Sequence, residues 1–143
     1  MENKNKKVNK KKRLYRLEVG VACIYKDGKY LIQSRPEGKS FVGHWEFPGG
    51  KREKNEDYPT CIKREIKEEL DVEVKVGPVF FEEHHNFGKI NLILHFRQCE
   101  IIKGEPRPLE GQNIDWVAPQ DFHKVKFLET NAKALEKLQS MSS

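Results

Sequence analysis

The spacing of the apolar residues changes once in the middle of the chain, and this change limits the fold more than any other feature of the sequence. Four apolar side chains recur there at the spacing of one helical face: Cys61, Ile62, Ile66 and Leu70. Asp57 is a suitable N-cap, and Pro59 falls in the first helical turn, where its missing N–H costs nothing. We therefore predict one amphipathic helix over residues 58–70.

The sequence on both sides of this helix is typical of strands. Before it, β-formers and the Asp27-Gly28 turn predict strands at 17–25, 29–35 and 45–50, the last running into a glycine-rich turn. After it, alternation and turn residues predict strands at 72–76, 79–86, 89–102 and 113–117, with Gly77-Pro78 ending the first of them. A final helix is predicted over 127–139, with an apolar face made of Leu128, Ala132, Leu135 and Leu138. This order of elements predicts an α/β (α+β) fold in which a mixed sheet lies between two helices.

The positive charge of the chain is concentrated at its N-terminus. The 143 residues carry a formal net charge of +5, yet residues 1–13 hold seven basic side chains and one acidic one, so the remainder is close to neutral. A like-charged tail of this kind cannot bury apolar surface, and we predict that 1–13 is disordered while 14–140 forms a single domain. The tail is interpreted either as a solubilising segment or as an arm that attracts polyanions such as RNA.

The three cysteines are odd in number, far apart and without a Cys-x-x-Cys pair. This pattern argues against a disulfide framework or a zinc site and is typical of a reducing cytoplasm. The longest uncharged apolar run, residues 19–25, is far shorter than the roughly 20 residues that a membrane helix needs. We therefore expect a cytoplasmic protein that does not bind a membrane, and we expect it to be a monomer.

Three carboxylates share one face of the predicted helix. Residues three and four positions apart are neighbours on a helix, so Glu65, Glu68 and Glu69 lie together. Arg64 stands four residues before Glu68 and can pair with it or with an acid of the preceding loop. Two carboxylates about 5 Å apart repel by roughly 3 kcal/mol at an effective dielectric constant near 20. On an exposed helix screening reduces this cost greatly, so a solvated helix face is the alternative interpretation.

The wider spacing favours a particular family. Reading from Gly50, five residues precede Glu56, seven more precede Arg64-Glu65, and an aliphatic residue, a second acidic pair and Val72 follow. This pattern resembles the Nudix box, Gly-x5-Glu-x7-Arg-Glu-U-x-Glu-Glu-x-Gly-U, in which U is aliphatic. The one departure is Asp71 in place of glycine. Aspartate reaches the left-handed conformation expected after a helix, so we interpret Asp71 as a tolerated cap that costs about 1 kcal/mol.

The resemblance implies a Nudix-type α/β/α sandwich that hydrolyses a phosphoanhydride bond with Mg²⁺ or Mn²⁺. Carboxylates are the hard oxygen ligands that these cations prefer, and the cations lower the pKa of a water that attacks phosphorus. In the family, the box glutamates bind the metals and one of them deprotonates the water. Carried over by position, Gly50, Glu65, Glu68 and Glu69 bind metal, while Glu65, Glu68 and Arg64 are catalytic. Glu56 is implied to pair with Arg64 and orient the loop.

Residues 45–51 and the segment Glu110-Gly111-Gln112 are similar to those of MutT-type enzymes, the 8-oxo-dGTP diphosphatases. This similarity adds Glu110, a loop glutamate beside the metals in that type, to both the metal-binding and the catalytic candidates. It also implies a substrate-binding set of Arg35, Glu46, Phe47, Gly49, Lys51 and Asn131. An asparagine amide offers a donor and an acceptor side by side, which suits the O6 and protonated N7 of 8-oxoguanine. Ile90 departs from the pattern, because that type places a second arginine there.

Several of these residues have a simpler alternative. Glu110 could be a surface acid in a loop, and Arg35 a surface arginine. Phe47 could be a core aromatic. Asn131 could be a plain N-cap of the last helix. The sequence leaves these alternatives open.

The observations together predict an enzyme that hydrolyses nucleoside triphosphates, with 8-oxo-dGTP or (d)GTP as candidate substrates and a nucleoside monophosphate and pyrophosphate as products. Such an enzyme would remove oxidised nucleotides before DNA synthesis. The first alternative is an RNA 5′-pyrophosphohydrolase that acts on triphosphorylated RNA ends and uses the basic tail. The second is a non-catalytic nucleotide-binding module, and the complete set of box glutamates argues against it.

Overall fold

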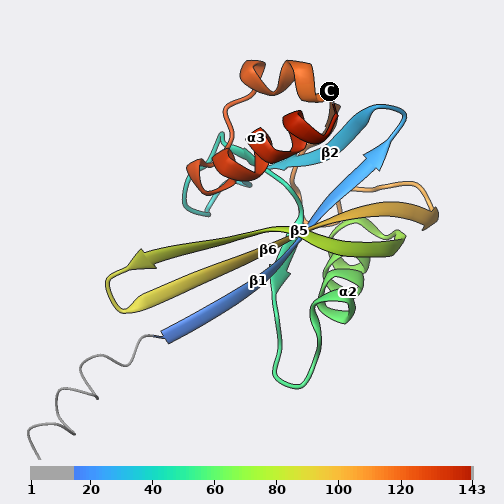
Figure 1. Ribbon diagram of the computed structural model, residues 1–143. Coiled ribbons are helices and arrows are strands. Elements are labelled where there is room, and N and C mark those ends of the chain that lie inside the picture. Colours follow the sequence, from blue (N-terminus) through green and yellow to red (C-terminus); the bar gives the residue numbers. More distant parts are fainter. Residues whose placement is uncertain (1–14, 143) are drawn as a thin grey trace, which may run out of the picture.

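The computed structural model describes residues 15–142, so the predicted tail over 1–13 lies outside the described residues. A mixed sheet forms the centre of the molecule, with helices on its two faces (Figure 1). Its strands are β1 (Tyr15–Lys26), β2 (Lys29–Ser34), β3 (Trp45–Glu46), β4 (Gly49–Lys51), β5 (Glu73–Phe87), β6 (Ile90–Lys103) and β7 (Ile114–Val117). The strand order is β3-β2-β1-β6-β5, with β4 paired to β1 and β7 paired to β2. The pair β1–β6 is parallel and the other named pairs are antiparallel, which confirms the predicted mixed sheet.

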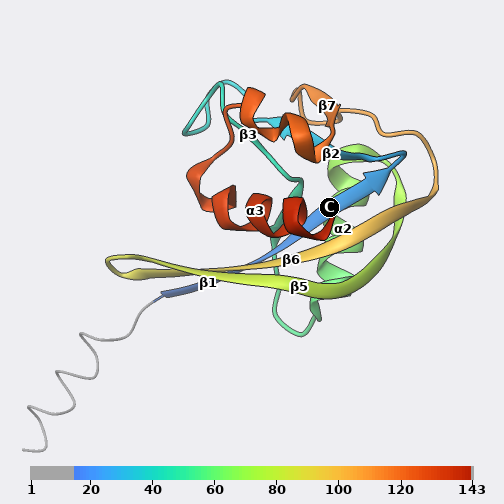
Figure 2. The same ribbon diagram turned by 45° about the horizontal axis from the view of Figure 1, so that its top comes forward.

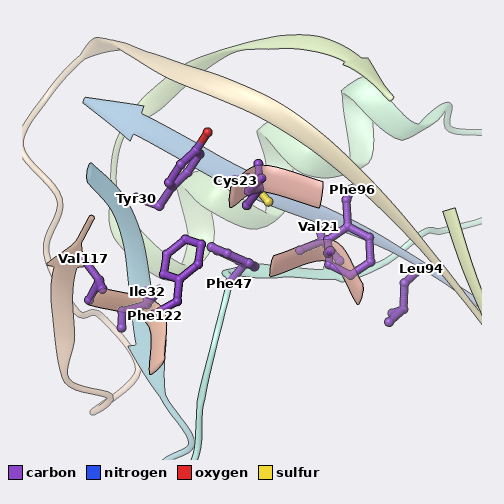
Figure 3. Packing of buried hydrophobic residues seen from close by; sticks show 11 residues of the cluster. Val21, Cys23, Tyr30, Ile32, Phe47, Leu94, Phe96, Val117 and Phe122 are labelled. Atoms are coloured by element: carbon purple, nitrogen blue, oxygen red, sulfur yellow. The ribbon is translucent and has the colours of Figure 1, made fainter. Parts of the chain in front are cut away.

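Helix α2 (Tyr58–Leu70) covers one face of the sheet and helix α3 (Ala132–Met141) covers the other (Figures 1 and 2). Successive side chains of a strand point to opposite faces, and β1 supplies both layers. Val21 and Cys23 belong to the apolar cluster on the α3 side, part of which Figure 3 shows. Ala22 and Ile24 belong to the cluster on the α2 side. The result is the α/β/α sandwich that the sequence predicts.

Helix α2 confirms the prediction at both ends. The backbone N–H of Thr60 donates a hydrogen bond of 2.8 Å to the Asp57 side chain, which is the N-cap. At the other end Asp71 is left-handed, with φ 58° and ψ 36°, and its N–H donates to the carbonyl of Lys67. The Asp71 carboxylate lies 2.6 Å from Arg107 and 3.3 Å from Lys67. Local capping signals therefore predict both ends of this helix, and Arg107 adds a distant contact at its C-terminal end.

The prediction that Gly77-Pro78 ends a strand is wrong. β5 is one strand of 15 residues, and its pairing with β6 shifts register around Val76 and Val79. The Gly77 carbonyl accepts a hydrogen bond of 3.0 Å from Arg97 of β6, so the chain bulges without leaving the sheet. Because β5 is the last strand in the order, Pro78 can be accommodated at the sheet edge.

The predicted start of the last helix is also wrong. α3 begins at Ala132, after a short 3-10 turn at Glu129–Asn131. Phe127 instead forms a parallel bridge with Trp45, and the N–H of Leu128 donates to the Trp45 carbonyl at 2.9 Å. These backbone bonds hold the segment extended, and Ala132 is exposed where an apolar face was expected. A further 3-10 turn at Pro119–Lys124 was not predicted.

Within residues 15–142, none of the helices is both long enough and apolar enough to span a bilayer.

Candidate active site

The glycine turn before α2 is in close contact with the first glutamate of the predicted acidic face. A Cβ atom added to Gly50 would collide with the carboxyl group of Glu65. A Cβ added to Gly49 would collide with the carbonyl of Gly20 on β1. Gly49 therefore requires glycine because it lies against backbone, whereas a side chain at Gly50 would displace the end of Glu65, whose carboxylate lies directly against the turn.

Glu69 connects α2 to the same turn through its carboxylate. Its Oε2 accepts a hydrogen bond of 3.2 Å from the N–H of Gly49, and its Oε1 accepts one of 3.3 Å from Gln33 on β2. Gln112 donates at 3.2 Å both to Gln33 and to the backbone carbonyl of Glu69. Burial raises the pKa of Glu69 to about 8, and the carboxylates of Glu65 and Glu110 add to the increase. The structure thus holds a buried carboxylate at the centre of an amide network.

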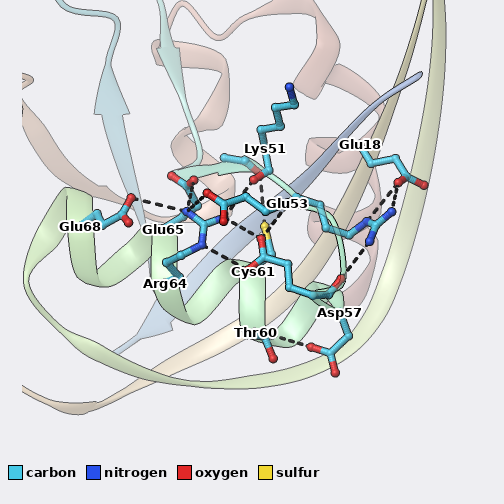
Figure 4. A network of polar contacts seen from close by, with 12 residues as sticks. Glu18, Lys51, Glu53, Asp57, Thr60, Cys61, Arg64, Glu65 and Glu68 are labelled. Carbon is cyan, nitrogen blue, oxygen red and sulfur yellow. Dashed lines mark hydrogen bonds and ion pairs between the residues drawn. The ribbon is translucent and has the colours of Figure 1, made fainter. Parts of the chain in front are cut away.

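Arg64 is the centre of the ionic network on the outer side of α2 (Figure 4). It binds Glu56 through two nitrogens, at 2.6 Å and 3.2 Å, which confirms the predicted ion pair. It also donates to Glu65 at 2.8 Å and to the Lys51 carbonyl at 3.1 Å. Glu68 lies farther away, at 3.6 Å. The hydrogen bond from Arg64 lowers the pKa of Glu56 to about 2. One guanidinium therefore fixes both the loop before the helix and the Glu65 side chain.

The donor chemistry at this turn fits a hard divalent cation. Burial raises the pKa of Glu65, and Glu68 and Glu110 add repulsion that Arg64 only partly offsets. Over the described part of the chain, however, no three acidic, histidine or cysteine side chains form a ready metal-binding group. Glu65 is turned toward Arg64, and both oxygens of Glu69 accept hydrogen bonds. Binding a cation here would require these side chains to change partners.

Glu110 is exposed in the loop after β6. The neighbouring N–H of Leu109 donates to the Glu69 carbonyl at 3.1 Å, and that of Arg107 donates to the Leu70 carbonyl at 2.9 Å. These bonds attach the loop to the C-terminal end of α2. Glu110 is therefore near enough to Glu65 and Glu69 to raise the pKa of both carboxyl groups.

A small pocket of about 70 Å³ opens beside the glycine turn, on the α3 side of the sheet. It is lined by Val19, Val21, Glu46, Phe47, Gly49, Leu94, Thr130 and Asn131. Asn131 is buried, and its Oδ1 accepts a hydrogen bond of 3.4 Å from the Phe47 N–H instead of capping α3. Phe47 lines the pocket and also belongs to the core cluster, so a position in the pocket wall and a position in the core do not exclude each other.

The other predicted substrate residues differ in position. Arg35 does not line the pocket, but it donates to Glu46 at 3.1 Å and so holds a lining residue. Burial raises the pKa of Glu46. Lys51 does not line the pocket, and its ammonium donates to the Tyr15 hydroxyl at 3.0 Å. A larger cavity, of about 380 Å³ near Tyr25 and Met141, contains none of the predicted site residues.

Sequence reasoning missed Gln33 and Gln112, the two amide side chains that hold Glu69 in place. It also missed four residues that line the pocket, namely Val19, Val21, Leu94 and Thr130. The alternation of β1 gives a signal for Val19 and Val21, because both face the same side of a strand. For Gln33 we find no sequence signal, since its partner Glu69 is 36 residues away.

An α/β/α fold in which a glycine turn packs against the glutamates of a helix is the arrangement that the sequence motif predicts for a Nudix hydrolase. A family model described as NUDIX domain matches residues 20–137, and the chain belongs to the Nudix family. CTP pyrophosphohydrolase of Escherichia coli (strain K12) is 30% identical over 120 residues, which cover 84% of this chain and 89% of that protein. 8-oxo-dGTP diphosphatase of Proteus vulgaris is 35% identical over 101 residues, 71% of this chain and 88% of that protein.

Solved structures agree with this assignment. The E. coli ORF135 protein superposes with a TM-score of 0.80 at 27% identity, covering 91% of this chain and 93% of that one. The MutT protein of methicillin-resistant Staphylococcus aureus 252 gives 0.75 at 30% identity, with 90% and 98% covered. The chain is therefore a Nudix pyrophosphohydrolase, related to enzymes that act on nucleotides.

Proposed function

We propose that this enzyme hydrolyses nucleoside 5′-triphosphates to a nucleoside monophosphate and pyrophosphate in a metal-dependent reaction, with (d)GTP or 8-oxo-dGTP as the preferred substrates. One observation carries the proposal. Gly49 lines the pocket with Asn131 and also donates its N–H to Glu69 on the acidic helix. A base in the pocket and a polyphosphate at the carboxylates would thus belong to one molecule.

The proposed ligands for Mg²⁺ or Mn²⁺ are Glu65, Glu68, Glu69 and Glu110, with the backbone carbonyl of Gly50. When bound, the cation would neutralise phosphate charge and lower the pKa of water. The exposed Glu68 and Glu110 can turn toward a ligand at little cost, whereas Glu65 is held by Arg64. We therefore propose that Glu65 is a metal ligand with a fixed orientation, and that Glu68 and Glu110 are ligands that move toward the cation when it binds.

The chain itself would orient the substrate and accept a proton. A water oxygen attacks phosphorus in line and the bond to the bridging oxygen breaks, which gives the nucleoside monophosphate and pyrophosphate and releases a proton. The candidate proton acceptors are the carboxylates of Glu65, Glu68 and Glu110. Arg64 acts through Glu65 by fixing its carboxylate at 2.8 Å.

Recognition of the base is proposed to use the Asn131 amide, which presents a donor and an acceptor to O6 and N7 of guanine or 8-oxoguanine. Its buried position at the end of the pocket supports this role. CTP is the second candidate substrate, because the CTP pyrophosphohydrolase of E. coli matches 84% of the chain.

A nucleotide panel tests the proposal. The protein would be incubated with Mg²⁺ and CTP, UTP, ATP, GTP, dGTP and 8-oxo-dGTP, with products analysed in ¹⁸O-labelled water. We expect the highest kcat/KM for a guanine nucleotide, with pyrophosphate released. A maximum for CTP would favour the second candidate, and no cleavage of any triphosphate would reject the proposal. Glu68→Gln should reduce turnover without unfolding the protein.

A further inference from the structure

Glu83 on β5 continues the floor of the pocket beyond the residues that line it. Val19 pairs with Leu94 across β1 and β6, and Leu94 pairs with Glu83 across β6 and β5. Val19 and Leu94 both line the pocket. Directly paired side chains on adjacent strands have Cβ atoms about 4.5–5.5 Å apart and lie on the same face of the sheet. The Glu83 side chain therefore stands on the α3 face, immediately beside Leu94.

This carboxylate is buried but poorly paired. Glu83 is 7% exposed, and its side chain makes two long ion-pair contacts through one oxygen. Its nearest partners are His85 Nε2 at 3.5 Å and Lys133 Nζ at 3.7 Å, and His85 Nε2 is itself buried without a hydrogen bond. Both contacts of Glu83 are longer than an ordinary hydrogen bond, so the carboxylate keeps the capacity to accept one from a ligand.

The contact with Lys133 places the Glu83 carboxylate close to the start of α3. Lys133 lies in the first turn of α3, two residues after Asn131, and its ammonium reaches Glu83. The pocket wall at Thr130 and Asn131 and the side chain of Glu83 therefore meet at the same junction between β5 and α3.

We propose that Glu83 is a specificity-determining residue that accepts a hydrogen bond from the exocyclic amino group of the substrate base. The inference rests on the proposed function, since it assumes that a nucleotide places its base in this pocket. An ionised carboxylate is only an acceptor, so it pairs with the amino group of guanine, cytosine or adenine. It repels the carbonyl oxygen that uracil and thymine present in place of the cytosine amino group. The enzyme would therefore select nucleotides with an amino-bearing base.

Guanine satisfies both polar groups of the site. Its N1–H and N2 amino group lie side by side on one edge and can both donate to a carboxylate. Its O6 and N7 lie toward the other edge, where an asparagine amide can pair with them. Glu83 and Asn131 would thus read different edges of one base.

The test compares substrates that differ mainly in the amino group: CTP against UTP, and GTP against ITP, which lacks the 2-amino group. In the wild-type enzyme we expect kcat/KM to favour the amino-bearing member of at least one pair by about ten-fold or more, because a site built to hydrogen-bond a group discriminates against analogues that lack it. Glu83→Gln keeps the shape but loses one acceptor, and it should reduce that ratio by about ten-fold. The effect should fall mainly on KM, with kcat for the amino-bearing substrate largely kept.

Glu82→Gln is the matched control. Glu82 precedes Glu83, points to the opposite face and is 44% exposed, so its replacement should leave the ratio unchanged. Glu83→Asp keeps the charge near Lys133 and withdraws the carboxylate by one methylene. Glu83→Asp should also reduce the kcat/KM ratio, and it replaces Glu83→Gln in the test if that variant does not fold.

The outcomes separate the two proposals. If the wild-type enzyme cleaves no triphosphate, the proposed function fails. If it cleaves them but distinguishes neither pair, or if both Glu83 variants keep the wild-type ratio, only the role of Glu83 is rejected. A narrowed ratio with an unchanged thermal midpoint supports recognition of the base, because a purely structural role would not alter the relative rates of two substrates.

Discussion

The Glu69 carboxylate accepts a hydrogen bond from the backbone N–H of Gly49 at 3.2 Å, and this bond joins the acidic helix to the edge of the pocket. Its other oxygen is held by Gln33, so the side chain is fixed from both sides. In the proposed binding mode, one buried acid would set the spacing between the polyphosphate at the carboxylates and the base in the pocket.

The first prediction concerns Glu69 and pH. Its folded-state pKa, about 8, lies above the ordinary value of 4.5, so the folded protein holds a proton that the unfolded chain has released. Between these values the metal-free protein should become less stable as pH rises, and added Mg²⁺ should weaken or reverse this trend. Urea unfolding in EDTA at pH 5 to 8 measures the slope. Glu69→Gln should flatten it, and an equally steep slope in that variant would contradict the assignment.

The second prediction concerns Arg64. Its planar guanidinium holds Glu56 through two nitrogens and Glu65 through a third contact, a geometry that lysine cannot reproduce. Arg64→Lys should reduce kcat by about ten-fold or more with a smaller change in KM, because Glu65 loses its orientation. Steady-state kinetics measure the effect. The neighbouring exposed Lys63 provides the control, since Lys63→Gln should leave kcat unchanged.

The third prediction concerns Gly50. A methyl group there would occupy the position of the Glu65 carboxyl group, so Gly50→Ala should displace Glu65 from the turn. We expect weaker Mn²⁺ binding, a fall in kcat and a lower thermal midpoint. Mn²⁺ titration by electron paramagnetic resonance measures the binding directly. Binding and turnover equal to those of the wild type would show that the Glu65 contact has no functional role.

The fourth prediction concerns Asn131. Its side chain does not cap α3, so the stability that Asn131→Ala loses, about 1–3 kcal/mol, should come from the buried Phe47 N–H, which loses its acceptor. The variant should also raise KM for the best substrate, because the pocket loses its amide. Urea unfolding and steady-state kinetics separate the two effects. A loss of stability with unchanged KM would show that Asn131 has a structural role only.

The parts of the structure that the sequence predicts correctly depend on local signals. α2 was predicted with both ends correct because Asp57, Pro59 and Asp71 act within one turn of the helix. The bulge in β5 was missed, because whether Gly77-Pro78 ends a strand depends on Arg97 in the next strand. The start of α3 was misplaced for the same reason, since Trp45 holds Phe127 and Leu128 extended.

The candidate site divides in a similar way. The glutamates and Arg64 lie within one motif, so their spacing reveals them. The contact between Asn131 and Phe47 joins residues 84 positions apart, and sequence spacing carries no information about such a distance. Glu83 was not singled out, because an acid on an alternating strand looks solvent-exposed until the register with β6 is known.

Successive residues of β1 point to opposite faces of the sheet, so substitutions in this strand affect either the pocket or helix α2. Val19 and Val21 line the pocket, whereas Gly20 between them packs against Ile62 and Cys61 of α2. With the base bound as we propose, a substitution at one of the valines would reshape base selection, while one at Gly20 would disturb helix α2, which carries the proposed metal ligands. Substrate preference could therefore diverge among related enzymes while the hydrolytic machinery on the other side of the same strand stays constant.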